Sequence, residues 1–459
     1  MRSPPSTSSR EPARSDRLLA GARSLLQGPA FWVLLTVLGA AQAALWLAGL
    51  PAEGAAASFA LRALLLFALQ AASVALLWNR SGGRALWLVL GFAVVFRAAA
   101  FTWPPDLSSD LYRYAWDGRV QMSGQSPYAA PPADPSLADL RDEAIWPRIN
   151  RPEAVTVYPP GGQLAFLALA ATGLDSIPGL KAVATLTELG ALLLLVLILR
   201  RRRLPLGRLA IYAWSPLIIS EVCVSAHLDT LVLPLMIGAL LLAEERRWTT
   251  AGVLLGAAAS LKLYPVLLLF ALPWTSLRRE ALRRTVPAAA AVVAAAYALY
   301  ASSAGLGVLG FLPEYVRTGE DFNPGLRGFL QDALAPVLAE ARPVAMALCA
   351  ATLVATLLLL ARRPGEDPFR RGADIALAFV LLLPTAVHPW YALWLVPLAA
   401  LRPSFAGLWL VGTLPLSYLK YGSPSGELPP WVPLLIWVPA LAILFAQRVQ
   451  KGSASVSGA

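Results

Sequence analysis

The stretch "LKAVATLTELGALLLLVLILRRRR", residues 180–203, is an apolar run that ends in consecutive arginines. A helix rises about 1.5 Å per residue, so the run Leu180–Leu199 is long enough to cross a hydrocarbon layer of about 30 Å. Within lipid, a single segment satisfies its own backbone only as a helix. Because Lys and Arg concentrate in cytoplasmic loops, Arg200–Arg203 predict a cytoplasmic end for this membrane-spanning helix.

The composition of the whole chain is typical of a protein that crosses a membrane many times. Of 459 residues, 57% are hydrophobic and only 14% are charged. The net charge of +11 is dispersed in short basic clusters beside apolar runs, which argues against nucleic acid as a partner. The two cysteines, Cys223 and Cys349, lie in apolar runs and indicate neither a disulfide framework nor a metal cluster.

The apolar runs predict an all-α fold, a polytopic transmembrane bundle of about 12–14 spans. Several runs are shorter than the roughly 17 residues of a straight crossing, which predicts half-helices that meet at mid-depth. The expected spans are Phe31–Leu50, Ala56–Trp78, Ala85–Phe101, Leu180–Leu199, Leu204–Ser220, Leu228–Ala243, Trp248–Leu261, Tyr264–Leu277, Val286–Ser303, Arg342–Ala361, Ala373–Val387, Pro389–Leu401, Phe405–Tyr418 and Trp431–Ala446.

The two ends of the chain are expected to lie outside the bundle. Residues 1–27 are rich in Ser, Pro and Arg without an apolar period, which predicts a disordered basic tail. The run Phe31–Ala43 imitates a cleavable signal peptide, but apolar residues continue to Leu50, which favours an uncleaved first span. The expected membrane domain is 28–447, followed by a short tail, 448–459.

Orientation follows from the basic clusters. An N-terminus in the cytoplasm sends all of them to that side, including Arg246–Arg247, Arg278–Arg284 and Arg362–Arg371. The protein is then expected in the cell's inner (plasma) membrane with both termini in the cytoplasm. Two long polar loops, 102–159 and 304–341, are expected on the external side. Because the unusual polar segments all reach this external face, they predict a shared cavity there.

The first external loop contains the stretch "SSDLYRYAWDGRVQMSGQSPY", residues 108–128. As a helix, its turn of about 100° per residue gathers the acidic and basic side chains on one face. Either these charges simply face water, or the helix lies on the membrane surface and its carboxylates meet a lipid headgroup; its Tyr and Trp residues favour the second interpretation. The face comprises Asp106, Asp110, Arg113, Tyr114 and Asp117.

Two turns follow this helix. In "SGQSPY", Gly124 and Pro127 favour a structural turn, which ends at Tyr128. "VYPPGG" then introduces a short apolar helix, expected to be juxtamembrane or re-entrant. Its Tyr158 and Gln163 either line the cavity or anchor the interface.

Three ionisable residues, Glu221, His227 and Asp229, sit in "SEVCVSAHLDT" at the outer junction of two spans. Ionisable groups near lipid are costly unless they are paired or functional. A divalent metal is one possible ligand, although spacings of six and two residues are not a standard metal-binding pattern. The favoured interpretation is that His227 and Asp229 orient substrate or a diphosphate-like group.

Two further motifs carry cations. Lys262, in "SLKLYP" with Tyr264, either snorkels to the interface or binds a phosphate at the membrane surface. The absence of another basic residue in that hairpin favours the phosphate. In "FNPGLRGF", Arg327 is a candidate second phosphate clamp beside Asn323, a candidate substrate contact.

The last motif is "HPWYALW", with His388, Trp390 and Tyr391. Such a run is either part of an aromatic belt or suited to sugar stacking or an isoprenoid entrance. Both histidines of the protein fall on the predicted external face. No Walker motif, dinucleotide-binding glycine loop, serine nucleophile elbow or HExxH zinc motif is present, so soluble-nucleotide chemistry is not expected.

Taken in order, "SDLYRYAWDGRVQMSGQSPY", "YPPGGQLAF", "SAHLDT", "LKLYP" and "HPWYALWLVPL" resemble the motif series of bacterial GT-C glycosyltransferases of the polyprenol-phosphate-mannose-dependent mannosyltransferase type. The resemblance covers about residues 106 to 397. It implies a multi-spanning fold, juxtamembrane helices in a large first external loop, an acidic catalytic residue in that loop and a polyprenyl-phosphate sugar donor. Asp110 matches the family's loop acid, whereas Gln125-Ser126 depart from the family's usual turn.

The expected function is transfer of a hexose to a lipid or glycan acceptor at the external face of the membrane, with inversion at the anomeric carbon. The resemblance implies that the hexose is mannose. Asp110 is the expected base, with Asp106 and Asp117 as the other candidates, and Arg113, Lys262 and Arg327 would bind the phosphate. The competing hypothesis is a transporter or flippase for a lipid-linked saccharide. Hydrolysis by paired carboxylates is disfavoured, because a hydrolase needs no lipid-embedded bundle.

Overall fold

A computed structural model describes residues 28–51, 53–272, 277–318, 322–365 and 367–456. Within these ranges the regular elements are all helices, and no strand occurs, which confirms the predicted all-α fold. The predicted tail 1–27 lies outside the described residues.

The first three helices pack against one another as apolar rods. They are α2 (Pro29–Leu47), α3 (Ala55–Leu77) and α4 (Gly83–Phe101), all within a few residues of the predicted spans. Their close approach requires Gly39, because a Cβ there would lie 2.5 Å from the Phe92 ring. The buried faces carry large side chains such as Trp46 and Phe96, which join the main core.

The loop between α4 and α7 contains an amphipathic helix against an apolar one. The elements are α5 (Asp110–Met122), the 3₁₀ turns η1 (Pro135–Leu140) and η2 (Trp146–Arg148), and α6 (Pro160–Ala171). α5 crosses α6 closely enough that a Cβ on Gly118 would lie 2.6 Å from the carbonyl oxygen of Phe166. The short helix predicted after "VYPP" is therefore present, and it packs against α5.

The centre of the bundle contains a long helix and a broken one. α7 (Ile177–Arg201) carries Glu188, which forms a buried ion pair with Arg97 of α4. The next predicted span is broken by Pro216 and bends by 51°. Its pieces, followed by two further helices, are η3 (Leu206–Leu209), α8 (Ala210–Ala213), α9 (Pro216–Ile219), the π-helical turn η4 (Ser220–Val224), α10 (Asp229–Glu244) and α11 (Trp248–Leu261).

The second half of the chain alternates long helices with short ones. They are η5 (Tyr264–Ala271), α12 (Arg278–Ala304), η6 (Gly305–Leu309), α13 (Leu312–Thr318), α14 (Gly325–Leu334), α15 (Ala341–Arg362), α16 (Pro368–Leu382), η7 (Pro389–Ala392), α17 (Leu395–Leu401), α18 (Phe405–Thr413), η8 (Leu414–Gly422) and α19 (Trp431–Val456). Since α19 continues to Val456, the tail predicted from residue 448 is helical over most of its length.

Fewer helices qualify as complete spans than the predicted 12–14. Among the described residues, six helices are long and apolar enough to cross a membrane, or seven with the bent pair at Pro216. Other predicted spans are short: α11, for example, has 14 residues. The difference has a physical reason, because Pro and polar residues divide several apolar runs into pieces that pack inside the bundle.

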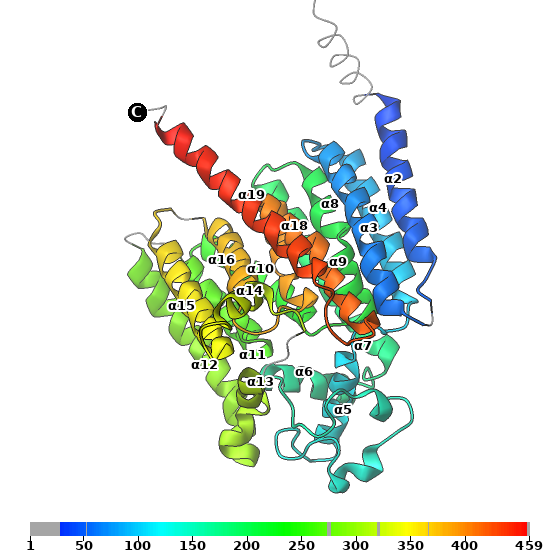
Figure 1. The fold of residues 1–459 in the computed structure, drawn as a ribbon, viewed down its shortest axis with the longest axis vertical. Coiled ribbons are helices and arrows are strands. Elements are labelled where there is room, and N and C mark those ends of the chain that lie inside the picture. The colour runs from blue at the N-terminus through cyan, green and yellow to red at the C-terminus, as the bar shows by residue number, and fades with distance from the viewer. Residues whose placement is uncertain (1–27, 52, 273–276, 319–321, 366, 457–459) are drawn as a thin grey trace, which may run out of the picture.

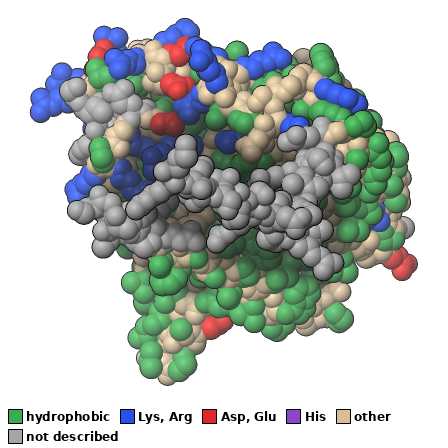
Figure 2. Space-filling view, turned by 90° about the horizontal axis from the view of Figure 1, so that it is seen from above, with side chains coloured by type: hydrophobic (Ala, Val, Ile, Leu, Met, Phe, Trp, Pro, Cys, Tyr) green, Lys and Arg blue, Asp and Glu red, His purple; other side chains and the backbone are tan. Residues whose placement is uncertain are grey.

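The two ends of the bundle differ in character. The start of α2 and the end of α19 lie at one end, whereas α5 and α6 lie at the other (Figure 1). Seen from the first end, Lys and Arg side chains gather along the upper and left parts of the view (Figure 2). The basic clusters and the loop helices thus occupy opposite ends.

Candidate active site

A cavity of about 680 Å³ opens beside α5, within the size range of small-molecule sites. Its polar wall comes from the start of α5, the segment 150–159 and the junction between α11 and η5. Its apolar wall comes from η5, α13, α15 and α16. The polar wall includes Asp110, Arg113, Asn150, Arg151, Tyr158 and Lys262, and the apolar wall includes Val266, Leu267, Val316, Leu353, Phe379 and Leu383.

The charges around the cavity are unequal. Asp110 is the only carboxylate among the described lining residues, and it shares the wall with the cations Arg113, Arg151 and Lys262. The wall therefore presents three cationic groups and one acid to the cavity.

Asp110 is held at the first turn of α5, where the helix dipole favours a negative charge. Its Oδ1 accepts a hydrogen bond from Asn150 Nδ2 at 3.0 Å, and its Oδ2 lies 3.7 Å from His227 Nδ1. The side chain keeps 16% of its surface exposed. Burial, and then the charge of Asp110, raises the pKa of the nearby Tyr158 phenol well above its ordinary value. Tyr158 therefore remains a neutral hydroxyl, and Asp110 is the acid within reach of a ligand.

His227 connects Asp110 to a second buried acid. Its Nε2 lies 3.2 Å from Glu221 Oε2, and Glu221 in turn accepts hydrogen bonds of 3.0 Å on both carboxylate oxygens from the Tyr418 hydroxyl. The π-helical turn η4 carries Glu221, and the sharp turn at Ala226, with φ of 49°, precedes His227. Glu221 and His227 do not line the cavity, and Asp110 is the lining residue next to His227.

The orientation of His227 is further fixed by stacking. Its imidazole stacks on Trp390 at 4.0 Å, and His388 stacks on the same indole at 4.4 Å. Two imidazoles at those distances are too close to share one face of the indole. Trp390 therefore carries an imidazole on each face, and it lines the cavity together with His388 and Tyr391. Its stacking on a sugar stays a prediction.

Each of the two predicted cations in the wall has a buried acid behind it. Lys262 Nζ lies 3.2 Å from Asp229 Oδ2, and Arg113 Nε lies 2.7 Å from Asp117 Oδ1. Neither Asp229 nor Asp117 lines the cavity, and both carboxylates are fully buried. The acids offset the cost of burying the cations, while the cations remain at the cavity surface.

Several other predicted site residues support this wall from behind. Gln163 of α6 binds Asp117, and the Tyr114 ring stacks on Phe166 at 4.7 Å. The Tyr128 hydroxyl donates a 2.8 Å hydrogen bond to the Tyr158 carbonyl oxygen, and burial raises the pKa of the Tyr128 phenol. Of this group only Tyr158 lines the cavity, although Tyr264 from the "LKLYP" motif lines it as well.

Three predicted residues lie elsewhere. Asp106 sits in the exposed turn before α5, so it does not share the helix face predicted for it. Asn323 is buried in the turn before α14, where its carbonyl oxygen accepts from Val387 N at 2.7 Å. Arg327 is buried on α14 with its Nη1 donating to Gln331 at 2.6 Å. None of the three lines the cavity, and the phosphate-binding role predicted for Arg327 stays a prediction.

Sequence reasoning did not find Asn150, Arg151 or Tyr421 in the wall. Arg151 has a left-handed backbone with φ of 50°, an unusual conformation for a non-glycine residue, and its guanidinium lies 5.6 Å from the centre of the Phe311 ring. The loop 102–159 contains several other arginines, and no pattern distinguishes Arg151 from them. A basic residue directly before Pro152 is the one local signal available.

The sequence left a divalent metal open as a ligand of Glu221, His227 and Asp229. In the part of the chain that the structure describes, no group of three or more His, Cys, Asp or Glu residues is arranged to hold a metal ion. Asp229 pairs instead with Lys262, and Glu221 with His227.

The described residues form a helical membrane bundle with a cavity whose polar wall carries one acid and three cations. The model of glycosyltransferase family 87 matches residues 156–385, half of the chain, so the protein belongs to this family. The model of the MptB C-terminal domain matches residues 325–448. No curated protein and no solved structure matched the chain. Both family matches begin after α5, and hence do not include Asp110.

Proposed function

We propose that this glycosyltransferase transfers a hexose from a polyprenyl-phosphate donor to a lipid or glycan acceptor at the external face of the membrane, with Asp110 as the base. The observation that carries the proposal is the single carboxylate beside three cations in the polar wall of a cavity whose other wall is apolar. Family membership supplies the reaction class, transfer of a sugar.

The chemistry of Asp110 fits a general base. As the acceptor oxygen attacks the anomeric carbon, its proton passes to a carboxylate oxygen of Asp110 while the new C–O bond forms. The bond from the anomeric carbon to the phosphate oxygen breaks, and its electron pair stays on the phosphate. A single displacement of this kind inverts the anomeric centre. General-base assistance contributes about 10²–10⁴-fold.

The cations fit the leaving group. The phosphate gains negative charge as the sugar departs, and fixed positive groups stabilise that charge in the transition state. Lys262 and Arg113 reach the cavity surface while Asp229 and Asp117 hold them from behind. Arg151 adds a third cation from the external loop.

The apolar wall fits a lipid-linked donor. Side chains from η5, α15 and α16 give the cavity an apolar wall. Burying isoprenoid carbon there gains about 25 cal/mol per Å² of apolar surface. A nucleotide sugar would leave this wall without a partner, whereas the first isoprene units of a polyprenyl phosphate would cover it.

The external location of the cavity is part of the proposal. The Lys and Arg clusters lie at the end of the bundle opposite α5 (Figures 1 and 2). Applying the positive-inside rule puts that end, and both termini, in the cytoplasm. The sugar itself is proposed as mannose on the strength of the motif resemblance alone.

The test uses purified protein in vesicles with radiolabelled polyprenyl-phosphate mannose and an acceptor lipid fraction. The proposal expects a labelled product whose anomeric configuration is opposite to that of the donor. Movement of the donor across the vesicle membrane without any product would instead support the transporter hypothesis and contradict the proposed function.

A further inference from the structure

Asp117 was a candidate catalytic acid, but its carboxylate is unavailable to a substrate. Both oxygens are already used: Oδ1 accepts from Arg113 Nε at 2.7 Å, and Oδ2 accepts from Gln163 Nε2 at 2.8 Å. The side chain has no exposed surface and does not line the cavity. A base must lie within hydrogen-bond reach of the proton that it takes, so Asp117 acts on substrate only through its partners.

Its main partner, Arg113, lines the cavity. The guanidinium is held on two sides, by Asp117 at Nε and by the Ala154 carbonyl oxygen at Nη1, 3.0 Å away. The third nitrogen, Nη2, is buried and has no hydrogen-bond partner among the described residues. A buried donor without a partner costs free energy, and an anionic oxygen in the cavity is the acceptor that would satisfy it.

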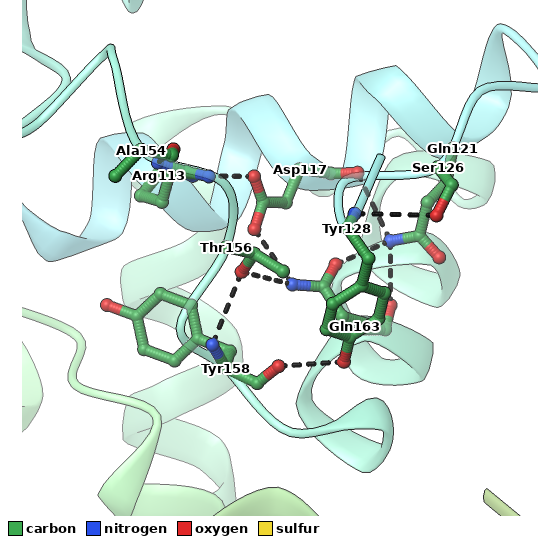
Figure 3. Close-up of polar contacts among 9 residues, drawn as sticks. All are labelled: Arg113, Asp117, Gln121, Ser126, Tyr128, Ala154, Thr156, Tyr158 and Gln163. Carbon is green, nitrogen blue, oxygen red and sulfur yellow. Dashed lines mark hydrogen bonds and ion pairs between the residues drawn. The ribbon is translucent and has the colours of Figure 1, made fainter. Parts of the chain in front are cut away.

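A buried polar network fixes the orientation of this pair (Figure 3). Gln163 Nε2 donates to Asp117 and also to Thr156 Oγ1 at 2.7 Å, while its Oε1 accepts from Gln121 Nε2 at 2.9 Å. Gln121 accepts in turn from the Tyr300 hydroxyl of α12 at 2.6 Å. Each member therefore ties α5 to a different neighbour: the 154–158 segment, α6 or α12.

We propose that Asp117 and Gln163 are positioning residues, which hold Arg113 so that its Nη2 meets a phosphate oxygen of a lipid-linked phosphate in the cavity. The inference rests on the proposed function, because it assigns the phosphate of that donor to Arg113. The planar guanidinium of arginine is pre-organised, so arginine loses less side-chain entropy than lysine for each hydrogen bond that it forms. A guanidinium already clamped by other groups has little rotational freedom left to lose when a ligand binds.

Charge and positioning make opposite predictions for Asp117→Asn. The substitution removes a negative charge behind Arg113, so net charge alone predicts tighter binding of a phosphate. Loss of the clamp predicts weaker binding, because Arg113 turns to find other acceptors. The probe is farnesyl phosphate, and its affinity for the purified full-length protein is measured by calorimetry without turnover.

The proposal expects Asp117→Asn to weaken farnesyl phosphate about tenfold or more. Farnesol, which lacks the phosphate, should bind both proteins equally. Asp139→Asn is the matched control, because Asp139 is exposed on η1 in the same loop. Equal or tighter binding of farnesyl phosphate by Asp117→Asn, or an equal loss for farnesol, would overturn the inference.

A charge swap tests the network itself. In Asp117→Asn with Gln163→Glu, the new amide donates to the new carboxylate, while Arg113 keeps an oxygen at position 117. We expect affinity within about threefold of the wild type. Gln163→Met keeps the ion pair between Arg113 and Asp117, so it should weaken the binding of farnesyl phosphate by less than Asp117→Asn. If Asp117→Asn does not fold, Gln163→Met provides the test instead. No recovery in the swap, or no loss in Gln163→Met, contradicts the role of the network.

Two further outcomes separate this inference from the proposed function. If the wild type binds no farnesyl phosphate, the proposed function fails and the inference fails with it. If the wild type binds and the Asp117 variant binds equally, only the inference fails. Inorganic phosphate is the second probe; binding as tight as that of farnesyl phosphate would overturn the assignment to a lipid-linked phosphate.

Discussion

Asp110 and Asp117 lie two turns apart on α5, yet their surroundings differ completely. Asp110 faces the cavity with 16% of its side chain exposed, and one of its oxygens lies 3.7 Å from a histidine. Asp117 is fully buried, and both of its oxygens accept hydrogen bonds. An acid with an accessible oxygen can take a proton, whereas an acid saturated by an arginine and an amide can only hold them.

The same division recurs across the cavity. Lys262 lies at the surface of the cavity and Asp229 behind it, just as Arg113 lies in front of Asp117. The ion pair Arg97–Glu188 differs from both, because each of its partners is buried away from the cavity and Arg97 also donates to the carbonyl oxygen of Ala213. A buried pair serves a site only where its cation reaches a ligand.

The largest effect is expected at Asp110. Asp110→Asn keeps the size of the side chain and its place at the helix start but removes the proton acceptor. Turnover should fall by about 10²–10⁴-fold, with donor affinity little changed. The measurement is initial-rate transfer from labelled donor, alongside donor binding. A variant with wild-type turnover would remove the distinction between the two acids.

The next effect is expected at Lys262. Lys262→Gln deletes a cation from the wall and leaves Asp229 buried without its partner. We expect a loss of about 10- to 100-fold in kcat/KM for the donor, the range of a charged hydrogen bond. Adding Asp229→Asn removes the unpaired buried charge, so the double variant should recover any stability that Lys262→Gln loses. Its kcat/KM for the donor should stay low. Restored activity in the double variant would show that Lys262 is needed only to balance Asp229.

A smaller effect is expected at His227. His227→Gln removes the imidazole between Asp110 and Glu221, and it also removes the stack on Trp390. Turnover should fall about tenfold while KM for the donor stays nearly constant, because His227 acts through Asp110 rather than on the phosphate. A change confined to KM would assign His227 to donor binding instead.

The smallest effect is expected at Asp106. Asp106→Asn alters an exposed acid in the turn before α5, outside the cavity wall. Exposed substitutions of this kind usually change stability by less than about 0.5 kcal/mol. Transfer should stay within about twofold of the wild type in the assay used for Asp110→Asn. A loss approaching that of Asp110→Asn would mean that the first-loop acids have exchanged roles.

The helix periodicity was enough to predict that Arg113 and two acids share one face, because these residues are neighbours on α5. It was not enough to separate Asp110 from Asp117, since that difference depends on Gln163, which lies 46 residues later in the chain. Asp106 left the predicted face because the helix begins only at Asp110, while Trp103 and Leu107 anchor the preceding turns in the core.

Long-range packing also explains the other differences. Arg327 looked like Lys262 in the sequence, a lone cation near an external turn, but α14 buries it beside Gln331. The stack of His227, Trp390 and His388 joins two motifs more than a hundred residues apart, which no local pattern reports. The predicted spans, by contrast, depend on local apolar length, and α2, α3, α4, α7 and α15 agree with them to within a few residues.

The most direct test of the account compares Asp110→Asn with Asp117→Asn in one transfer assay at saturating donor concentration. The account predicts that Asp110→Asn remains about a hundredfold or more below the wild type at every donor concentration, whereas Asp117→Asn recovers to within about tenfold as donor binding saturates. The reverse order, with Asp110→Asn rescued by donor and Asp117→Asn inactive, would contradict the assignment of Asp110 as the base.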